Sequence, residues 1–268
     1  TGEELADVQN STDARGVALD QVGVRDLKYP ITVLGRDEEM QQTVAEVSLS
    51  VGLPEEFKGT HMSRFVEVLN QYRGEFTMHT LPDLLQTLRE RLDAKQARTE
   101  IQFPYFLERT APVTEKEALM DYDCSFVGEV SGEDSTFTLG VTVPVTSLCP
   151  CSKEISDEGA HSQRGEFNIQ VRSVLNKEGD PTLIWIEELV EMAEASASSP
   201  LYPLLKRPDE RHVTMQAYQN PGFVEDITRD MAVQLKRDER VAWFHLEAEN
   251  FESIHNHNAF AEVTWERK

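Results

Sequence analysis

The chain has 268 residues, of which 39% are hydrophobic and 28% are charged, a composition typical of globular proteins with one large or two ordinary domains. Asp and Glu number 48 against 26 Lys and Arg, so the net charge of −22 excludes a nucleic-acid binder that relies on bulk positive charge and argues against an anionic membrane surface as partner. No apolar run reaches membrane-spanning length, the acidic N-terminal segment is unlike a secretory signal, and three cysteines do not form a disulfide framework. We therefore expect a cytoplasmic enzyme or binding protein.

In the first half of the chain, apolar residues repeat with the period of a strand in some segments and with the period of a helix in others. Residues 1–27 show no sustained period, so we expect an N-terminal arm there. The elements predicted after it are strands near 31–33 and 47–51, helices at 62–72 and 81–92, and strands at 101–105 and 122–126. His61 and Arg64 are expected to mark the start of the first helix, and Cys124 is expected to lie in the core.

The second half repeats this order. Its predicted elements are strands at 137–145 and 167–171, helices near 183–197 and 221–237, and strands at 241–248 and 259–265. Asn220 followed by Pro221 is typical of a helix start and predicts where the second of these helices begins. The sequence therefore predicts an α+β fold with an arm (1–27) and two β-β-α-α-β-β units (28–132 and 133–268), each an antiparallel sheet with two helices on one face.

The segment PVTSLCPCSKEISDEGAHSQRG begins where the most regular strand ends. Cys149 and Cys151 flank Pro150, which favours extended or turned chain over helix. His161 and Cys149 converge if residues 150–160 leave the strand end and return to it, which would place a thiol and an imidazole together. The alternative is two buried cysteines and a surface histidine.

Three further segments carry charged or ligating side chains. In LLKRPDERHVT, cations surround Asp209 and Glu210. This indicates either a ligating acidic side chain among phosphate-binding cations or a helix end with solvated charges. Glu225 lies in the first turns of a predicted helix, either aimed at a ligand or paired with Arg229.

In the third segment, ENFESIHNHNAFAE, His255 and His257 share a face if the chain is extended, and a turn would bring Glu252 to His255. These histidines could also be ordinary turn residues. No phosphate loop, dinucleotide fingerprint or serine elbow is present. Cys, His and Glu in separate loops, with one coordination position open, form the pattern of a catalytic zinc site.

Together the motifs resemble GTP cyclohydrolase IB, the prokaryotic type of that enzyme. The motifs that carry the resemblance are PVTSLCPCSKEIS, GAHSQRG, LLKRPDERHVT, NPGFVEDITRDMA and ENFESIHNHNAFA, with KGTHMSRF and TAPVTEKEALMDYD in the first half. The resemblance runs from about residue 20 to the C-terminus. It implies a tunnelling fold, a homotetramer with interfacial active sites, and a metal-dependent hydrolase using zinc or manganese. It also implies the conversion of GTP and water to 7,8-dihydroneopterin triphosphate and formate, the first step of folate biosynthesis, or in some organisms a step towards queuosine.

Residue by residue, the resemblance implies that Cys149, His161 and Glu210 are metal ligands. It implies that Glu252 and His255 act at the same centre, in proton transfer or as a further ligand, and that Glu225 binds the guanine edge. The residues implied for the triphosphate are Lys153, Arg164, Lys206 and Arg207.

Two other functions remain open at this level. One is a tunnelling-fold nitrile reductase acting on a deazaguanine, in which a cysteine attacks the substrate without a metal and NADPH is consumed. The other is a non-catalytic metal-binding assembly module, in which a zinc ion would keep no open position.

Overall fold

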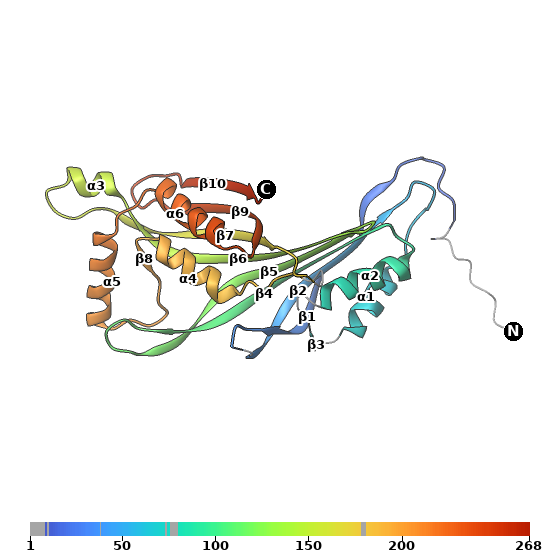
Figure 1. The fold of residues 1–268 in the computed structure, drawn as a ribbon, viewed down its shortest axis with the longest axis horizontal. Helices are drawn as coiled ribbons and strands as arrows, with labels where there is room; N and C mark the ends of the chain where they lie inside the picture. The colour runs from blue at the N-terminus through green and yellow to red at the C-terminus, as the bar shows by residue number, and fades with distance from the viewer. Residues whose placement is uncertain (1–8, 10, 38, 73, 76–79, 178–180) are drawn as a thin grey trace. The chain divides into compact units, whose positions relative to one another are not determined.

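The computed structural model of the chain describes residues 9, 11–37, 39–72, 74–75, 80–177 and 181–268 (Figure 1). Its strands are β1 (Leu19–Leu34), β2 (Met40–Leu53), β3 (Gly74–Glu75), β4 (Gln96–Thr110), β5 (Glu117–Ser131), β6 (Asp134–Leu148), β7 (Ser162–Ser173), β8 (Ser199–Pro200), β9 (Val241–Asn250) and β10 (Ala259–Glu266). Its helices are α1 (Met62–Gln71), α2 (Thr80–Leu92), α3 (Pro150–Ile155), α4 (Ile186–Ser196), α5 (Arg207–Gln219) and α6 (Val224–Arg237). The mixture of strands and helices confirms the predicted α+β class.

Hydrogen-bonded neighbours follow the order β10-β9-β7-β6-β5-β4-β2-β1-β3, with β8 paired to β6. The pairs β1–β2, β2–β4, β6–β7, β7–β9 and β9–β10 are antiparallel, and β1–β3 is parallel. The strands are divided between two compact units. One unit consists of 1–34, 40–103 and 125–137, and the other of 35–39, 104–124 and 138–268. The predicted boundaries at 28–132 and 133–268 stay a prediction.

In the first unit, two helices cover strands with one buried face. Residues of β2 alternate between buried and partly exposed positions, and those buried are Ala45, Val47, Leu49, Val51 and Leu53. Helix α1 begins after His61, as predicted, and α2 begins at Thr80. Both helices bury an apolar stripe, made of Phe65, Val68 and Leu69 in α1 and of Leu81, Leu84, Leu85 and Leu88 in α2. Burial of such stripes is the main source of stability for short helices.

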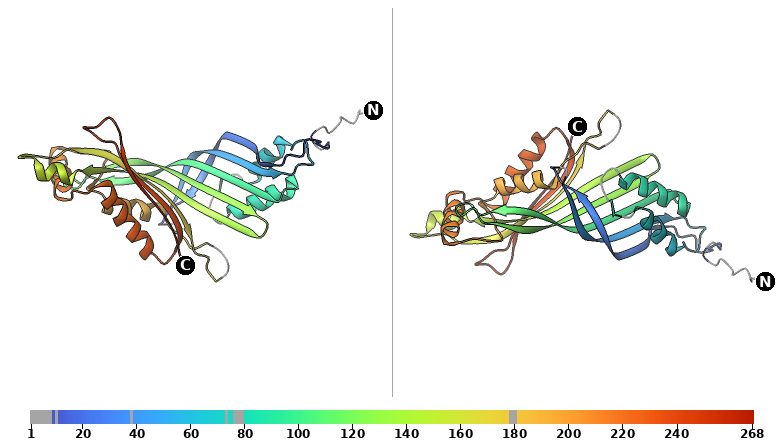
Figure 2. Two further views of the ribbon diagram at one scale, coloured as in Figure 1. Left: turned by 90° about the horizontal axis from the view of Figure 1, so that it is seen from above. Right: turned by 90° about the horizontal axis from the view of Figure 1, so that it is seen from below.

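The second unit holds all the predicted site residues. Helices α4 and α6 pack against each other, and α6 also packs on β9 and β10. Both views of Figure 2 place α4 and α6 on the same side of these strands. Cys124 at the end of the β5 segment of this unit is 4% exposed, and burial raises the pKa of its thiol. The prediction that Cys124 is a core residue is therefore confirmed.

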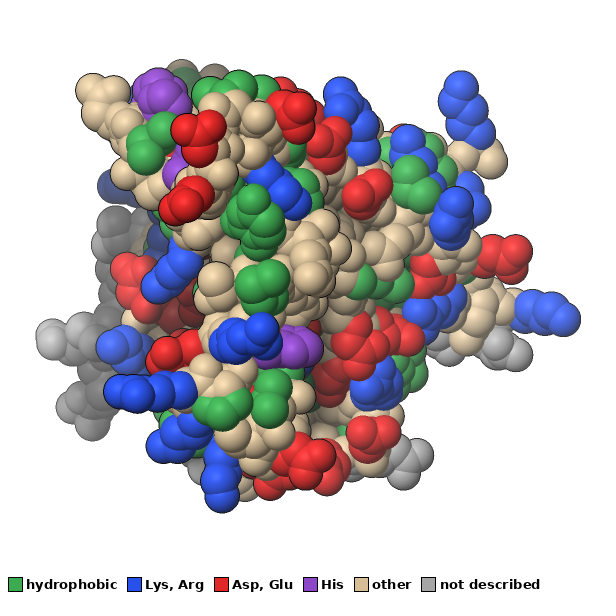
Figure 3. All heavy atoms as spheres, turned by 90° about the vertical axis from the view of Figure 1, so that its left-hand side faces the viewer, with side chains coloured by type: hydrophobic (Ala, Val, Ile, Leu, Met, Phe, Trp, Pro, Cys, Tyr) green, Lys and Arg blue, Asp and Glu red, His purple; other side chains and the backbone are tan. Residues whose placement is uncertain are grey.

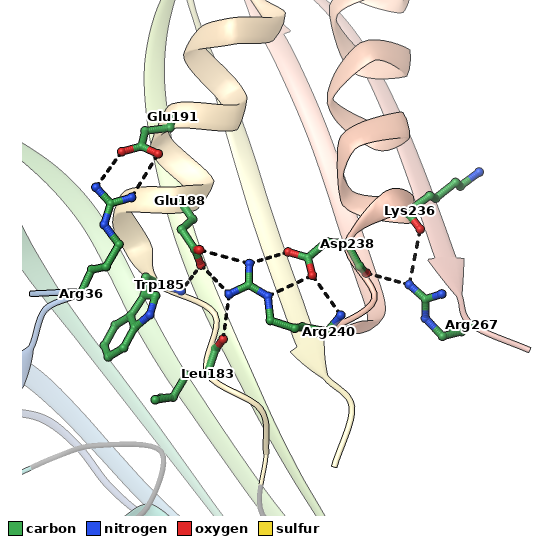
Figure 4. Close-up of polar contacts among 9 residues, drawn as sticks. All are labelled: Arg36, Leu183, Trp185, Glu188, Glu191, Lys236, Asp238, Arg240 and Arg267. Atoms are coloured by element: carbon green, nitrogen blue, oxygen red, sulfur yellow. Dashed lines mark hydrogen bonds and ion pairs between the residues drawn. The ribbon is translucent and has the colours of Figure 1, made fainter. Parts of the chain in front are cut away.

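Arg240 joins the ends of two helices in this unit (Figure 4). Its guanidinium donates to both carboxylate oxygens of Glu188 in α4, at 3.0 and 3.1 Å, and to Asp238 just after α6 at 2.7 Å. Glu188 also accepts from the backbone N–H of Trp185, which closes the first turn of α4. One planar cation thus fixes the start of α4 against the end of α6.

Two sequence predictions about strand and helix starts were wrong. Strand β1 begins at Leu19, inside the predicted arm. The prediction missed this start because the first residues of β1 are largely exposed on both faces and therefore show no hydrophobic alternation. Register shifts interrupt this part of the strand, and Asp26 adopts a positive φ of 59°. Asn220 is the C-cap of α5, and α6 begins three residues after Pro221 with Phe223 as its N-cap.

Helix α5 was not predicted as an element. Its sequence RPDERHVTMQAYQ has no apolar stripe, and only Asp209 and Ala217 are buried in it. A helix without such a stripe leaves no periodic signal in the sequence. Among the described residues, no helix is both long enough and apolar enough to cross a membrane.

We expect Arg240→Met to lower the free energy of unfolding by about 1–3 kcal/mol, because Glu188 and Asp238 would lose the cation that satisfies them. Chemical denaturation of both proteins measures the difference. Arg229→Met is the matched control, since the Arg229 side chain is 73% exposed and pairs with Asp226 across the surface of α6 at 3.6 Å. An equal loss in both variants would contradict the special role of Arg240.

Candidate active site

Antiparallel pairing brings three separate segments to one end of their strands. In the β6–β7 pair, Leu148 lies opposite Ser162, and the backbone N–H of Cys149 donates to the carbonyl of His161 at 3.2 Å. In the β7–β9 pair, Gly165 lies opposite Asn250, and Phe251 N–H donates to Arg164 O at 2.9 Å. The chain between Cys149 and His161 therefore leaves the strand end and returns to it, which was the condition for the two side chains to converge.

The short helix α3 occupies this excursion, so the expectation of non-helical chain around Pro150 was wrong. Proline is tolerated at the first helical position because its missing N–H would have no partner there. Cys149 is the N-cap, and its sulfur accepts a hydrogen bond from Ser152 N–H at 3.4 Å. The Ser152 hydroxyl oxygen accepts from His161 N–H at 3.2 Å, so Ser152 connects α3 to β7.

The imidazole of His161 lies between two polar side chains. Its Nδ1 is 2.9 Å from Oε1 of Gln163 and 3.9 Å from Oε2 of Glu252. The side chains of His161 and Glu252 are 13% and 12% exposed, respectively. The His161 imidazole and the Glu252 carboxylate therefore lie close together in a partly buried place, and a backbone hydrogen bond brings Cys149 to the same strand end.

His255 lies in the loop between β9 and β10, and its side chain is exposed. Its ring stacks on His257, with centroids 5.1 Å apart and an interplanar angle of 16°. Residues 253–257 form bends, so the two rings stack without the extended chain on which the expected shared face depended. The role of His255 beside Glu252 stays a prediction.

Helix α5 presents the second group of predicted residues. Lys206 is its N-cap, Arg207 its first residue, and the side chains of Lys206, Arg207 and Glu210 are exposed. A backbone hydrogen bond from Glu210 N–H to Lys206 O, at 2.9 Å, closes the first turn. Within the described part of the chain, no group of three or more His, Cys, Asp or Glu side chains is arranged to hold a metal ion. The ligand role of Glu210 therefore stays a prediction.

Asp209 is the residue of this segment that the sequence reasoning misread, because it is buried rather than solvated. Its carboxylate accepts from the backbone N–H groups of Val113, Thr114 and Lys206 at 2.8–2.9 Å and from the Thr114 hydroxyl at 2.6 Å. Burial raises the pKa of Asp209, but these hydrogen bonds outweigh burial and hold the pKa well below its usual value. Asp209 thus anchors the N-terminus of α5 to the turn between β4 and β5.

The sequence contains a local signal for this role of Asp209. Asp209 stands at the third position of α5, and its side chain reaches back to the N-cap N–H, as acidic residues do in a capping box. Lys206, Arg207 and Glu210 therefore take their positions from a neighbouring carboxylate.

Glu225 lies in the first turn of α6, where the helix dipole favours a negative charge, and its side chain is exposed. Arg229 pairs with Asp226 at 3.6 Å. The loop before α6 is tied to the strand end by Gly222 N–H, which donates to Leu148 O at 3.1 Å. Helix α6 therefore starts next to the strand end that leads into Cys149.

The other predicted cations lie on two different elements. Lys153 of α3 donates to Tyr218 O at 2.5 Å and lies over the Tyr218 ring, 4.3 Å from its centroid, which joins α3 to α5. Arg164 on β7 has an exposed side chain. Figure 3 shows a face on which Lys and Arg are interspersed with Asp and Glu. Any polyanion bound at this face would be held by local cations that lie among acidic side chains (Figure 3).

Solved structures of other proteins share the fold of the chain. Uricase from Arthrobacter globiformis superposes with a TM-score of 0.51 at 10% identity, covering 92% of this chain and 93% of that chain. Urate oxidase from Bacillus subtilis 168 gives a TM-score of 0.52 at 10% identity, covering 92% and 98%. At this identity the likeness concerns the fold alone, and it confirms the predicted tunnelling fold.

A family model described as "Type I GTP cyclohydrolase folE2" matches residues 5–261, and the chain belongs to this family. It is 50% identical over 259 residues to GTP cyclohydrolase FolE2 of Syntrophotalea carbinolica, covering 97% of this chain and 94% of the relative. It is 48% identical over 264 residues to GTP cyclohydrolase FolE2 of Geobacter metallireducens, covering 98% of each. The resemblance seen in the motifs is confirmed at the level of a type I GTP cyclohydrolase, and the family description gives the FolE2 type in place of the IB name.

We expect Asp209→Asn to lower the melting temperature at neutral pH, because the amide turns a donor towards backbone N–H groups that need an acceptor. The folded-state pKa of Asp209 is depressed, so its contribution is complete above the unfolded-state pKa of about 4 and is lost as pH falls below it. The difference in melting temperature between wild type and variant should therefore shrink in acid. Asp230→Asn, at an exposed position of α6, is the control and should change little at either pH.

Proposed function

We propose that the chain converts GTP and water to 7,8-dihydroneopterin triphosphate and formate. Membership of the type I GTP cyclohydrolase family supports this activity. The observation that carries the proposed chemistry is the meeting of Cys149 and His161 at one strand end through a backbone hydrogen bond, with Glu252 3.9 Å from the His161 ring. A thiol, an imidazole and a carboxylate from adjoining segments are the side-chain types that bind a metal ion and transfer protons.

We infer that a divalent ion, zinc or manganese, works at this strand end. The donor types fit such an ion. The Cys149 sulfur accepts a hydrogen bond from an N–H group, which stabilises negative charge on the sulfur. The His161 ring contacts Gln163 through Nδ1, which leaves Nε2 for the ion. Glu210 of α5 is the proposed third ligand. When bound, an ion of this kind lowers the pKa of water towards 7 and supplies a nucleophile for C8 of guanine.

The protein's own groups would move protons and orient the base. Glu252 or His255 donating a proton to N7 would make C8 more electrophilic, a step typically worth about 10²–10⁴-fold in rate. Glu225 at the exposed start of α6 can accept two N–H bonds from the guanine edge, and adenine lacks this pair of donors. Lys206 and Arg207 at the start of α5, with Lys153 and Arg164, would bind the triphosphate.

Several finer features belong to the same proposal. We propose a homotetramer with active sites at subunit interfaces and a cytoplasmic enzyme that feeds folate synthesis. The nitrile reductase alternative is not favoured, since the family and its similar relatives are described as GTP cyclohydrolases.

We expect the purified protein to release a product from GTP that becomes fluorescent after oxidation, as pterins do. Chelation should abolish this activity, and Zn²⁺ or Mn²⁺ should restore it. Cys149→Ala, His161→Ala and Glu210→Ala should each weaken metal binding, measured by competition with a chromophoric chelator. Cys151→Ala is the matched control, because Cys151 is exposed on α3 two residues from Cys149. Turnover of GTP by rigorously metal-free protein would overturn the metal-dependent mechanism.

We expect Glu225→Gln to retain the fold and the metal but to lose GTP turnover by about 10–100-fold, because one guanine N–H would face an amide donor at a cost of about 1–3 kcal/mol. Steady-state kinetics with GTP measures the loss. Asp226→Asn is unsuitable as a control because Asp226 accepts from Phe223 N–H and closes the helix start. Asp230→Asn, exposed further along α6, should behave like wild type, and equal activity of Glu225→Gln and wild type would refute the guanine-binding role.

A further inference from the structure

A buried polar network lies directly behind His161. Gln163 is 9% exposed, and its side chain reaches His161 Nδ1 with Oε1 at 2.9 Å and Ser147 Oγ with Nε2 at 3.5 Å. Ser147, 1% exposed, also accepts from Nδ2 of Asn250 at 3.0 Å, and Asn250 is 3% exposed. Burying polar groups costs free energy unless they are hydrogen-bonded, and these hydrogen bonds offset part of that cost. They also constrain the position of the Gln163 amide next to the His161 ring.

The network joins the three strands that deliver the proposed site. Ser147 belongs to β6, which leads into Cys149; Gln163 belongs to β7, which starts after His161; Asn250 ends β9 just before Glu252. The three strands approach closely here. A Cβ added at Gly165 would lie 2.6 Å from Glu249 O and 2.8 Å from Asn250 Oδ1, so glycine at this position permits the approach of β7 and β9.

The contacts at Nδ1 favour one of the two neutral tautomers of His161. Nδ1 faces the amide oxygen of Gln163 at 2.9 Å and a carboxylate oxygen of Glu252 at 3.9 Å. Both oxygens accept hydrogen bonds, so a proton on Nδ1 makes both contacts favourable, whereas a lone pair on Nδ1 would oppose both. In neutral imidazole the other nitrogen, Nε2, then has the free lone pair.

We propose that Gln163 is a positioning residue that holds His161 in the Nδ1–H tautomer and so presents Nε2 to the site. Ser147 and Asn250 hold Gln163 in turn. The inference rests on the proposed role of His161 as a ligand. Histidine ligands commonly donate their second ring N–H to an oxygen, and loss of such a partner typically weakens metal affinity by about 10–100-fold.

The test reads the tautomer in metal-free protein with ¹³C- and ¹⁵N-labelled histidine, by NMR shifts assigned to His161 through the spectrum of His161→Ala. Wild type should show Nδ1–H as the major neutral form. Gln163→Met keeps the length of the side chain but removes the acceptor, so it should raise the population of the Nε2–H form. A major Nε2–H form in wild type would mean that the Gln163 amide is oriented the other way and would overturn the proposal.

Zinc affinity supplies the second measurement. We expect Gln163→Met to raise the Kd for Zn²⁺ about 10–100-fold, and Ser147→Ala to change tautomer and affinity in the same direction by a smaller amount. Ser147→Ala removes only one hydroxyl and keeps the proposal testable if Gln163→Met fails to fold. Gln170→Met, exposed on the same strand, is the matched control. Unchanged tautomer and Kd in folded Gln163→Met or Ser147→Ala would refute the role of the network.

The tautomer is measured without metal or GTP, so its outcome is separate from that of the activity assay. A wild type that lacks GTP turnover but shows the Nδ1–H form would refute the proposed function and support the tautomer assignment. A wild type that turns over GTP with His161 in the Nε2–H form would support the proposed function and refute the tautomer assignment.

Discussion

The pairing register of β6, β7 and β9 is the constraint on which the proposed site depends. Leu148 opposite Ser162 and Gly165 opposite Asn250 place the residues just beyond these strands at one end. Because successive strand residues point to opposite faces, a slip of one residue in either pair would turn the side chains of the strand to the other face. The alternating buried residues of β6 and β7 fix the register, so the core of the second unit also determines the geometry of Cys149 and His161.

The helices reach this strand end through hydrogen bonds of a different kind. Gly222 N–H binds Leu148 O and positions the start of α6, and Lys153 binds Tyr218 O and joins α3 to α5. Helix α5 has almost no apolar face of its own, so the buried carboxylate of Asp209 takes over part of the anchoring that hydrophobic contacts give to α4 and α6. Charged residues at the start of α5 can therefore stay exposed and available to a ligand.

The sequence was sufficient to predict the elements with a buried stripe or a buried strand face. It predicted both helices of the first unit, the helices α4 and α6, and the strands β4–β7, since their apolar residues repeat with the period of the element. It failed for α5, which has no stripe, for α3, whose single turn starts with proline, and for the exposed beginning of β1. In the site, the return of the chain from Cys149 to His161 was one of two alternatives that the sequence left open, whereas the contacts of Gln163 and Asp209 were not predicted. The contacts of Gln163 with Ser147 and of Asp209 with Val113 and Thr114 join strands and turns far apart in the sequence, to which no local pattern points. Of the Asp209 contacts, only the bond from Lys206 N–H is local, and it has the sequence pattern of a capping box.

The use of an amide behind His161 has an electrostatic reason. The chain carries a net charge of −22, Glu252 already lies 3.9 Å from the ring, and the proposed site would add a Cys149 thiolate and receive a triphosphate. A carboxylate at position 163 would also accept from Nδ1, but it would place one more negative charge in a partly buried region where charges are weakly screened. The neutral Gln163 amide can orient the imidazole without adding to this repulsion, and its Nε2 gives Ser147 a donor that a carboxylate lacks. The Gln163 amide therefore meets the geometric requirement of the ring without adding a negative charge next to an anionic substrate.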